Sequence, residues 1–514
     1  MNYPSATDVL VIGGGATGLG VAWDASLRGL SVVVLEQGDL GQGTSGRYHG
    51  LLHSGGRYIL SDPTSARECA RENLILRRIV PHAIEDTGGL FVSTPADPPE
   101  YADEWFAASR REGVAAQEIT PSDALRLEPL LTPEAVRVFH VQDAALDSFD
   151  LLHALAAAIV AAGGHVLIRH RLERLTPAPD GFLAAVASPS NGSLLHIQAR
   201  VVVNAAGPFA GRVAQLAGAT LPLALGKGTM IAMATRLVNT VVNRLKPPAD
   251  GDIIVPVGTV AVLGTTDTPV EAPEDVRIEP WEVDLLLYEA AALIPSIQDH
   301  RPLRAWAGIR PLYRPPDAGQ TETRRLSRAH ALIDHAAAGG PPRLVTIIGG
   351  KLSTFRRMAE DTVDLVQRHL GSSAPCRTDE TPLSPPPRRF HRLPDRLESL
   401  GRHAAEPQLG LVCECELVTT EDIRRALDLS PTSDLDDLRR DLRLGMGPCQ
   451  AAYCAYRSAG HLVRHDHETD AASALAIFLE ERWRGVRPLM WGQSLRQFEA
   501  NRRIYQDLLG MDRP

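Results

Sequence analysis

The sequence predicts an α/β protein that begins with a dinucleotide-binding βαβ unit and ends in a small, mainly helical module. Three observations support this prediction. The stretch DVLVIGGGATGLG has the pattern of a buried strand, a glycine-rich turn and the start of a helix. Two later stretches, 199–218 and 343–370, repeat the order of apolar strand, Gly-containing turn and helix. Four of the 6 cysteines fall within 42 positions near the C-terminus.

The first βαβ unit carries a phosphate-binding glycine pattern. Gly13, Gly15 and Gly18 form a GxGxxG between the strand and the helix, and Glu36 follows 18 positions later. Such glycines let backbone N–H groups and a helix N-terminus approach a pyrophosphate, and an acid at this distance can accept hydrogen bonds from a ribose. A tight turn without a ligand is the alternative. Neither later stretch contains a second GxGxxG, so we do not expect electrons to come from NAD(P)H.

Composition and charge set the class of protein. The 514 residues are 44% hydrophobic and 22% charged, as in globular proteins of two to four domains. A net charge of −9 argues against a nucleic-acid partner. The longest apolar run, from Leu151, contains histidines and a glycine pair and predicts no membrane span. No positive residue precedes the N-terminal apolar stretch, so we expect no signal peptide and a cytoplasmic protein.

The cysteine cluster has the spacing of a metal site. Cys413 and Cys415 are followed, after 33 residues, by Cys449 and Cys454. In a reducing cytoplasm this pattern favours metal binding over disulfides. Four thiolates can hold a 2Fe–2S cluster or a tetrahedral zinc ion, and Cys-x-Cys is less typical of zinc sites. Thiols without a metal are the third alternative.

Lysine is rare in this chain. Of the 53 Lys and Arg residues, only Lys227, Lys246 and Lys351 are lysines. Lys351 lies in IIGGKLSTFRR, where a strand should end and a helix should begin. A compact cation beside the positive end of a helix would favour negative charge nearby. A solvent-exposed lysine at a helix cap is the alternative.

Several motifs together resemble one family. DVLVIGGGATGLG, GTSGRYHGLLHSGGRY, VVVNAAGPFAG, LGTTDT, WAGIRPL and IIGGKLSTFRR resemble the FAD-dependent glycerol-3-phosphate dehydrogenases. The tail, LVCECELVTTEDI and GMGPCQAAYC followed by FLEERWRGVRPLMWGQSLRQFE, resembles the A (catalytic) subunits of anaerobic glycerol-3-phosphate dehydrogenases. The resemblance covers nearly the whole chain apart from a Pro-rich connector.

This resemblance implies a fold and its boundaries. We expect a Rossmann-type FAD-binding domain, like those of glutathione reductase and D-amino-acid oxidase, with an interleaved α+β substrate domain. The oxidoreductase domain would span 1–370, with FAD-binding parts at about 1–75, 150–215 and 331–370 and substrate parts at about 76–149 and 216–330. A Pro-rich, exposed linker would cover 371–408. A four-cysteine domain resembling the helical 2Fe–2S domain of bacterioferritin-associated ferredoxin would cover 409–514.

The resemblance also implies site residues. Those expected at FAD are Gly13, Gly15, Ala16, Thr17, Gly18, Glu36, Thr44, Ser45, Gly207, Gly349, Gly350, Leu352 and Thr354. Those expected at the substrate are Arg57, Tyr58, Thr265, Arg310 and Arg328. Arginine suits a phosphate because its planar fork donates two parallel hydrogen bonds.

Three of the implied residues are candidates for chemistry. Lys351 would stabilise negative charge on the reduced flavin or a developing oxyanion, and Arg310 would also orient the substrate. His53 is a candidate base or flavin neighbour and is equally consistent with a structural role. Thr265, with Thr266, could bind substrate or close a turn. Met230 stands where aerobic enzymes often have a histidine, so no general base is assigned.

The implied reaction is oxidation of sn-glycerol 3-phosphate to dihydroxyacetone phosphate by hydride transfer to FAD. Electrons would pass to a quinone through two partner subunits, one a second flavoprotein and the other an iron–sulfur protein that anchors the complex, which would hold the chain on the cytoplasmic face of the inner membrane. One alternative is an FAD oxidase or dehydrogenase of the same fold acting on a hydroxy or amino acid. Another is a non-catalytic flavin electron-transfer protein, whose flavin no small substrate would bleach.

Overall fold

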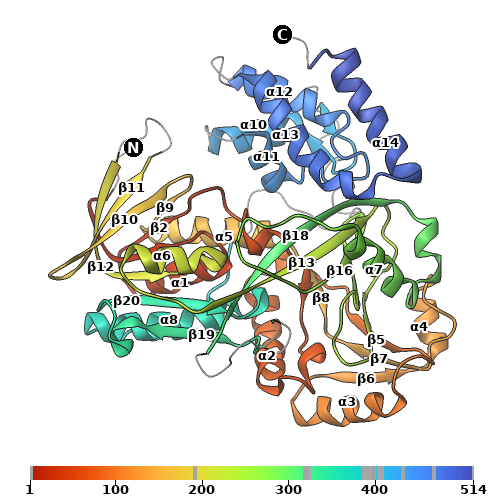
Figure 1. The fold of residues 1–514 in the computed structure, drawn as a ribbon, viewed down its shortest axis with the longest axis horizontal. Coiled ribbons are helices and arrows are strands. Elements are labelled where there is room, and N and C mark those ends of the chain that lie inside the picture. The colour runs from red at the N-terminus through yellow and green to blue at the C-terminus, as the bar shows by residue number, and fades with distance from the viewer. Residues whose placement is uncertain are drawn as a thin grey trace.

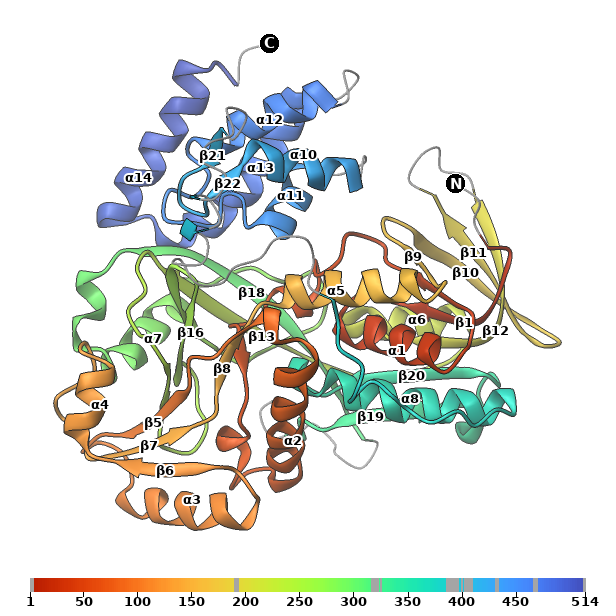
Figure 2. The ribbon, with the colours of Figure 1, turned by 180° about the vertical axis from the view of Figure 1, so that it is seen from behind.

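The computed structural model describes residues 4–188, 194–315, 323, 326–384, 397, 398, 401, 410–429, 434–465 and 470–511. Figures 1 and 2 show a nucleotide-binding domain and a second domain side by side, with a helical C-terminal module above them. Within the described residues, no helix is both long and apolar enough to cross a membrane.

The nucleotide-binding domain is built on one sheet. Its strands are β1 (Ala6–Ile12), β2 (Val32–Leu35), β9 (His165–Leu167), β10 (Arg171–Ala178), β11 (Gly181–Ala187), β12 (Leu194–Asn204), β19 (His330–Asp334) and β20 (Leu344–Gly349). The order β9-β2-β1-β12-β20 is parallel throughout. β19 adds an antiparallel edge to β20, while β10 and β11 form an antiparallel meander with the first half of β12.

Both faces of this sheet are buried, as expected for parallel strands rich in Val, Ile and Leu. Val9 and Val11 face α1 (Ala16–Leu27), α5 (Ser148–Ala161) and α8 (Phe355–Leu370). Leu10 and Ile12 point the other way, toward α6 (Ala210–Leu216) and the meander. The strands therefore alternate between two cores, which fixes their register.

The second domain is built on a larger mixed sheet. Its strands are β5 (Gly89–Ser93), β6 (Ala116–Ile119), β7 (Arg137–Val141), β13 (Leu223–Met233), β14 (Val241–Arg244), β15 (Ile253–Val257), β16 (Val260–Gly264), β17 (Thr268–Val270) and β18 (Pro302–Tyr313). Neighbouring strands are antiparallel except β14 and β5. α4 (Pro121–Leu127) and α7 (Pro280–Ala291) cover one face, and α3 (Pro99–Arg111) covers the other.

A small sheet and one helix lie where the two domains meet. The sheet consists of β3 (Leu51–Leu52), β4 (Ile84–Glu85) and β8 (Ala144–Leu146), and α2 (Pro63–Ile79) runs alongside.

The long strand β18 pairs with β13 along most of its length and places Arg310 opposite Gly226. A Cβ at Gly228, two residues further along β13, would collide with Arg310 Nη2, so this glycine leaves room for the arginine side chain.

The C-terminal module is mainly helical. It consists of β21 (Leu411–Cys413), β22 (Val418–Thr419), α10 (Thr420–Leu429), α11 (Leu435–Leu442), α12 (Cys454–His465), α13 (Ala471–Val486) and α14 (Gly492–Arg503). These elements enclose a hydrophobic core of their own. The module docks with α13 on β18 and α11 on α5 (Figure 1). At this junction the buried side chain of Arg440 contacts Asp39 at 2.5 Å.

The described start of the predicted Pro-rich linker is largely exposed and is anchored at two buried residues. Over residues 371–384 the chain follows α8, with Thr378 fully buried and Leu383 donating its N–H to Ile79 O at 2.7 Å. Thr378 is held because its hydroxyl accepts a hydrogen bond from a buried arginine, described next. The remainder of 371–408 lies outside the described residues apart from 397, 398 and 401.

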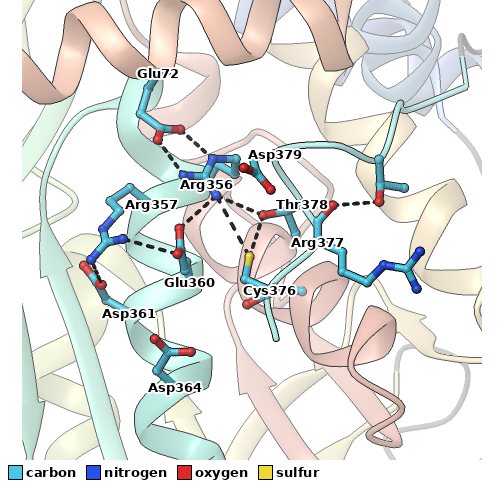
Figure 3. Close-up of polar contacts among 12 residues, drawn as sticks. Glu72, Arg356, Arg357, Glu360, Asp361, Asp364, Cys376, Arg377, Thr378 and Asp379 are labelled. Carbon is cyan, nitrogen blue, oxygen red and sulfur yellow. Dashed lines mark hydrogen bonds and ion pairs between the residues drawn. The ribbon is translucent and has the colours of Figure 1, made fainter. Parts of the chain in front are cut away.

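Arg356, at the start of α8, joins three parts of the chain (Figure 3). Its guanidinium makes two bonds to Glu72 of α2, at 2.8 and 2.6 Å, and one each to Glu360 and Thr378. Arg356 and Glu72 are both buried, so neither can exchange this partner for water. Because α2 follows Tyr58 and α8 follows Lys351, the pair holds these two turns next to each other.

Candidate active site

One cavity of about 1260 Å³ extends from the glycine-rich turn after β1 to the strands of the second domain. Most predicted site residues lie on its wall: Gly13, Gly15, Ala16, Thr17, Glu36, Thr44, Ser45, His53, Arg57, Tyr58, Gly207, Thr265, Arg310, Arg328, Gly349, Gly350, Lys351 and Leu352. The glycine-rich turn and the arginines therefore line the same cavity, which has room for a dinucleotide and a small substrate.

Two residues predicted at FAD do not lie on the wall. A Cβ at Gly18 would stand 1.9 Å from Gly13 O, so this glycine is needed for the packing of α1 against the turn. Thr354 is 1% exposed, and its hydroxyl donates to Lys351 O at 3.1 Å within the turn η9 (Leu352–Thr354). Gly18 and Thr354 therefore stabilise the two turns that line the cavity without lining it themselves.

The turn after β1 is shaped for a close ligand. Gly13 has φ +118, and a Cβ there would lie 2.5 Å from Ala205 O. A Cβ at Gly15 would meet only Ser45 Oγ, at 3.1 Å, so this position opens into the cavity. Ser45 Oγ accepts the Ala16 N–H at 3.0 Å, which fixes the first turn of α1. The N-terminus of α1 is thus presented to the cavity, as a pyrophosphate requires.

Glu36 is fixed at the same end. Its two carboxylate oxygens accept the N–H groups of Gly14 and Gly38, both at 2.8 Å. Burial raises the pKa of Glu36 above its ordinary value, and these N–H groups offset only part of that rise. Each oxygen keeps a second lone pair, which can accept from ribose hydroxyls. The turn, the helix end and this carboxylate together fit the ADP part of FAD.

The other end of the cavity carries two arginines joined by one carboxylate. Arg310 Nη1 donates to Asp267 Oδ1 at 3.0 Å, and Arg328 Nη2 donates to Asp267 Oδ2 at 3.2 Å. Arg310 Nη2 also donates to Thr266 O at 2.9 Å and to the Thr265 hydroxyl. Burial and the neighbouring Arg328 lower the pKa of Arg310 to about 10. Two cations and one anion leave a net positive charge facing the cavity.

Arg57 approaches the cavity from a different element. It lies in the turn η2 (Gly56–Tyr58), and its guanidinium donates to Asp252 Oδ2 at 3.1 Å and to Ala249 O at 3.0 Å. Asp252 is buried, so this pair fixes the arginine and neutralises it. Arg57 therefore offers less free charge to a ligand than the Arg310–Arg328 pair.

Lys351 differs from the other two lysines. Lys227 Nζ lies 2.8 Å from Glu282, and Lys246 Nζ lies 2.8 Å from Glu289. In the described part of the chain no carboxylate oxygen lies within 4.0 Å of Lys351 Nζ. Its contacts are Arg328 O at 3.2 Å and the ring of Tyr58, 4.5 Å to the centroid.

The local chain explains how Lys351 reaches the cavity. Gly349 and Gly350 have φ of +79 and +71, conformations that favour glycine, and they turn the chain sharply after β20. The Lys351 N–H donates to Thr354 Oγ1 at 3.2 Å and so begins the turn before α8. Its backbone thus has the predicted capping position, while its side chain lines the cavity.

Two histidines, the buried His53 and the half-buried His49, stand beside these cations. His53 packs against Tyr58 and His49, with ring centroids 5.3 and 5.8 Å apart. Burial holds the pKa of His53 well below its usual range, and burial with Arg57 and Arg310 lowers the pKa of His49 to about 3. Both rings are neutral at pH 7.

The four clustered cysteines lie in the C-terminal module and not on the cavity. Their thiols form two contacting pairs, Cys413 with Cys454 and Cys415 with Cys449. The Cys415 thiol and the backbone N–H groups of residues 451–453 lower the pKa of Cys449. Over the described ranges, no three His, Cys, Asp or Glu side chains lie in ready metal-binding geometry. The cysteines are thus gathered as two pairs.

Comparison with known proteins adds to this picture. The profile of the FAD dependent oxidoreductases matches residues 8–356. The A subunit of the anaerobic glycerol-3-phosphate dehydrogenase of Escherichia coli is 38% identical over 531 residues, covering 99% of this chain and 98% of the relative. The A1 subunit from Haloferax volcanii is 39% identical and covers 98% and 91%. The chain belongs to this family of A subunits. The resemblance found in the sequence is thereby confirmed.

Solved structures show the same fold as this A-subunit family member. The glycerol-3-phosphate dehydrogenase of Bacillus halodurans, complexed with FAD, matches with a TM-score of 0.68 at 21% identity, covering 95% of this chain and 96% of that one. Glycine oxidase from Geobacillus kaustophilus matches 75% of this chain and all of its own, with a TM-score of 0.57. The predicted Rossmann-type FAD fold is confirmed.

Some wall residues of this family member escaped the sequence analysis. Asp267 lies two positions after Thr265 in the LGTTDT motif, and His49 lies four before His53 in GTSGRYHGLLHSGGRY. Asp267 could have been noticed as an acid that follows shortly after a buried strand. Asp252, which holds Arg57 but does not line the cavity, gave no such signal, because its role depends on Arg57 approaching from another part of the chain.

Proposed function

We propose that the protein oxidises sn-glycerol 3-phosphate to dihydroxyacetone phosphate. The observation that supports this most strongly is the single cavity that joins the dinucleotide turn to the Arg310–Asp267–Arg328 group, in a chain of the A-subunit family. When bound, FAD accepts the hydride that leaves C2 of the substrate.

The residues of the cavity would then have separate tasks. Arg310 and Arg328 would bind the phosphate, since Asp267 holds both guanidiniums in place without cancelling their joint charge. Lys351 would stabilise negative charge between the substrate and the flavin. We leave the general base unassigned. Burial holds the pKa of His53 well below its usual range, so this histidine would be a weak proton acceptor.

The same fold also serves enzymes of amino acids, as the glycine oxidase match illustrates. That likeness is at 22% identity and concerns the fold alone, whereas the 38% relatives span the whole chain. A single arginine can hold a carboxylate in a bidentate pair. The second arginine adds further guanidinium donors, which favours a phosphate with its three terminal oxygens.

Substrate selectivity tests this proposal. We expect kcat/KM for sn-glycerol 3-phosphate to exceed that for glycerol by roughly 10³-fold, because about 4 kcal/mol of binding depends on the phosphate. sn-Glycerol 1-phosphate, the enantiomer of the substrate, is the matched control, because it carries the same charge with the opposite configuration at C2. Equal turnover of glycerol and its phosphate would refute phosphate recognition at this site.

FAD binding is tested at Gly15. Gly15→Val places two methyl groups where only Ser45 Oγ lies nearby, so the protein should fold but lose the approach of the pyrophosphate. We expect at least roughly tenfold weaker FAD binding, measured as bound flavin per folded protein. Gly460→Val, on α12 with no heavy atom within 4 Å of its added Cβ, is the control. Full FAD occupancy in Gly15→Val would refute this placement of the pyrophosphate.

We further propose a 2Fe–2S cluster, rather than zinc, on Cys413, Cys415, Cys449 and Cys454. The support is the spacing of the four cysteines, because the Cys-x-Cys pair is less typical of zinc sites, together with their place in one mainly helical module. The cluster would carry electrons out of the flavin domain.

The acceptors are proposed from the family. The relatives are named as A subunits, which supports a hetero-oligomer. We propose that two further subunits complete it and pass electrons to a quinone: a second flavoprotein, and an iron–sulfur protein that anchors the complex to the membrane. The chain would then be peripheral on the cytoplasmic face of the inner membrane.

A further inference from the structure

Arg482 in α13 is a buried cation that contacts no carboxylate within the described residues. Its side chain is 1% exposed, and Nη2 donates to Gly445 O at 2.8 Å and Gln450 Oε1 at 2.6 Å. Its Nε is buried and finds no acceptor among the described residues. The other two largest buried arginines, Arg356 and Arg440, each contact carboxylates. Burying a lone charge is costly, so an anion is expected close to Arg482.

The described part of the chain supplies no uncommitted anion nearby. Arg304 of β18 and Arg439 of α11 both act on Arg482 as further positive charges. The Asp436 carboxylate also acts on it but is already bound by Arg439, at 2.6 Å, and by Arg440. Burial and the two neighbouring cations therefore hold the pKa of Arg482 well below its usual range. An added negative group would remove this conflict.

The two acceptors of Arg482 belong to the loops that carry the cysteines. Gly445 accepts from Arg482 through its carbonyl, and its own N–H donates to the Cys413 sulfur. Gln450 directly follows Cys449 in the chain and accepts from Arg482 through its side chain. The guanidinium is therefore linked to one thiol of each pair through a single intervening residue: to Cys413 through Gly445, and to Cys449 through Gln450.

We propose that Arg482 is the internal counter-charge of the group bound by the four cysteines and that it raises the reduction potential of that group. This inference rests on the proposed 2Fe–2S cluster. Four thiolates make such a cluster anionic, and reduction adds one more negative charge. Cys454 also lies within electrostatic reach of Arg482. A buried cation here stabilises the reduced form more than the oxidised form, because the interaction grows with the charge.

Potentiometric titration of the holoprotein, followed by electron paramagnetic resonance, tests the proposal. Arg482→Gln keeps a donor for the two loops but removes the charge. We expect the equilibrium constant for cluster reduction to fall about tenfold, which is about 59 mV for one electron. The flavin in the same molecule should titrate at its wild-type potential and serves as an internal reference.

Arg457→Gln is the matched control. Arg457 carries the same charge near Cys413 and Cys454, but its side chain is 45% exposed and bound to Glu414. Solvent screens this charge, so we expect less than about a twofold change in the equilibrium constant. An equal fall in both variants would overturn the special role of the buried arginine.

Other outcomes are equally decisive. A cluster in Arg482→Gln with an unchanged potential would overturn the inference while leaving the cluster and the dehydrogenase in place. If Arg482→Gln fails to fold, Arg482→Lys should keep the equilibrium constant within about twofold of the wild type, because the charge remains; a fall of about tenfold there would also overturn it. A wild-type protein that contains zinc or no metal would refute the cluster itself.

Discussion

Arg310→Met should lower kcat/KM for sn-glycerol 3-phosphate by on the order of 10³-fold while FAD stays bound. Removing one partner from a buried, charge-assisted contact costs about 2–5 kcal/mol. Arg310 also donates hydrogen bonds that shape the site, to Asp267, Thr265 and Thr266. Without it, Asp267 would oppose the phosphate with only Arg328 to offset its charge. Steady-state kinetics and bound flavin measure the effect.

Two comparisons show whether Arg310→Met lowers kcat/KM through lost phosphate binding or through a disturbed structure of the site. Arg277→Met makes the same change at a side chain that is 81% exposed, and it should leave kcat/KM nearly unchanged. The slow oxidation of glycerol should also respond little to Arg310→Met, because glycerol has no phosphate to lose. If both substrates lose activity equally, Arg310 maintains the fold of the site and does not bind phosphate.

Lys351→Met should lower kcat by on the order of 10²-fold with little change in FAD content, as for the loss of one preorganised electrostatic group. Among the described residues Lys351 contacts no carboxylate, so its charge is available to stabilise negative charge that develops only during the reaction. The flavin midpoint potential should fall as well, because the reduced, anionic form loses a nearby cation. Stopped-flow reduction and a redox titration measure the two effects.

Two variants test this interpretation of Lys351. Lys246→Met also removes a lysine, but one that Glu289 already neutralises, and it should reduce the flavin at nearly the wild-type rate. Lys351→Arg keeps the charge on a longer, planar group, so poor rescue would show that size and position matter too. Wild-type reduction in Lys351→Met would leave this lysine with only its backbone role at the turn before α8.

Local features of the site could be predicted from the sequence. Gly13, Gly15 and Glu36 depend on a strand, a turn and a helix that are adjacent in the chain, so their spacing is sufficient. Lys351 could be singled out because lysine is rare and because paired glycines precede it. Gly18 was also recognised as part of the motif, but whether it touches a ligand or supports the turn depends on distances that spacing does not give.

Features that depend on contacts between distant segments could not be predicted. Asp267 has its role only because Arg310 of β18 and Arg328 both reach it. The burial of Thr378 after α8 depends on Arg356, which also binds Glu72 some 284 positions away. Thr378 and Leu383 are buried in an otherwise largely exposed stretch because their partners, Arg356 and Ile79, lie elsewhere in the chain.

Anaerobic addition of sn-glycerol 3-phosphate to the purified, FAD-bound protein tests the central claim most directly. The flavin absorbance should bleach and dihydroxyacetone phosphate should form, one molecule for each flavin reduced, while glycerol at the same concentration leaves the spectrum unchanged. A flavin that stays oxidised with sn-glycerol 3-phosphate, or that glycerol bleaches as readily, would contradict the account.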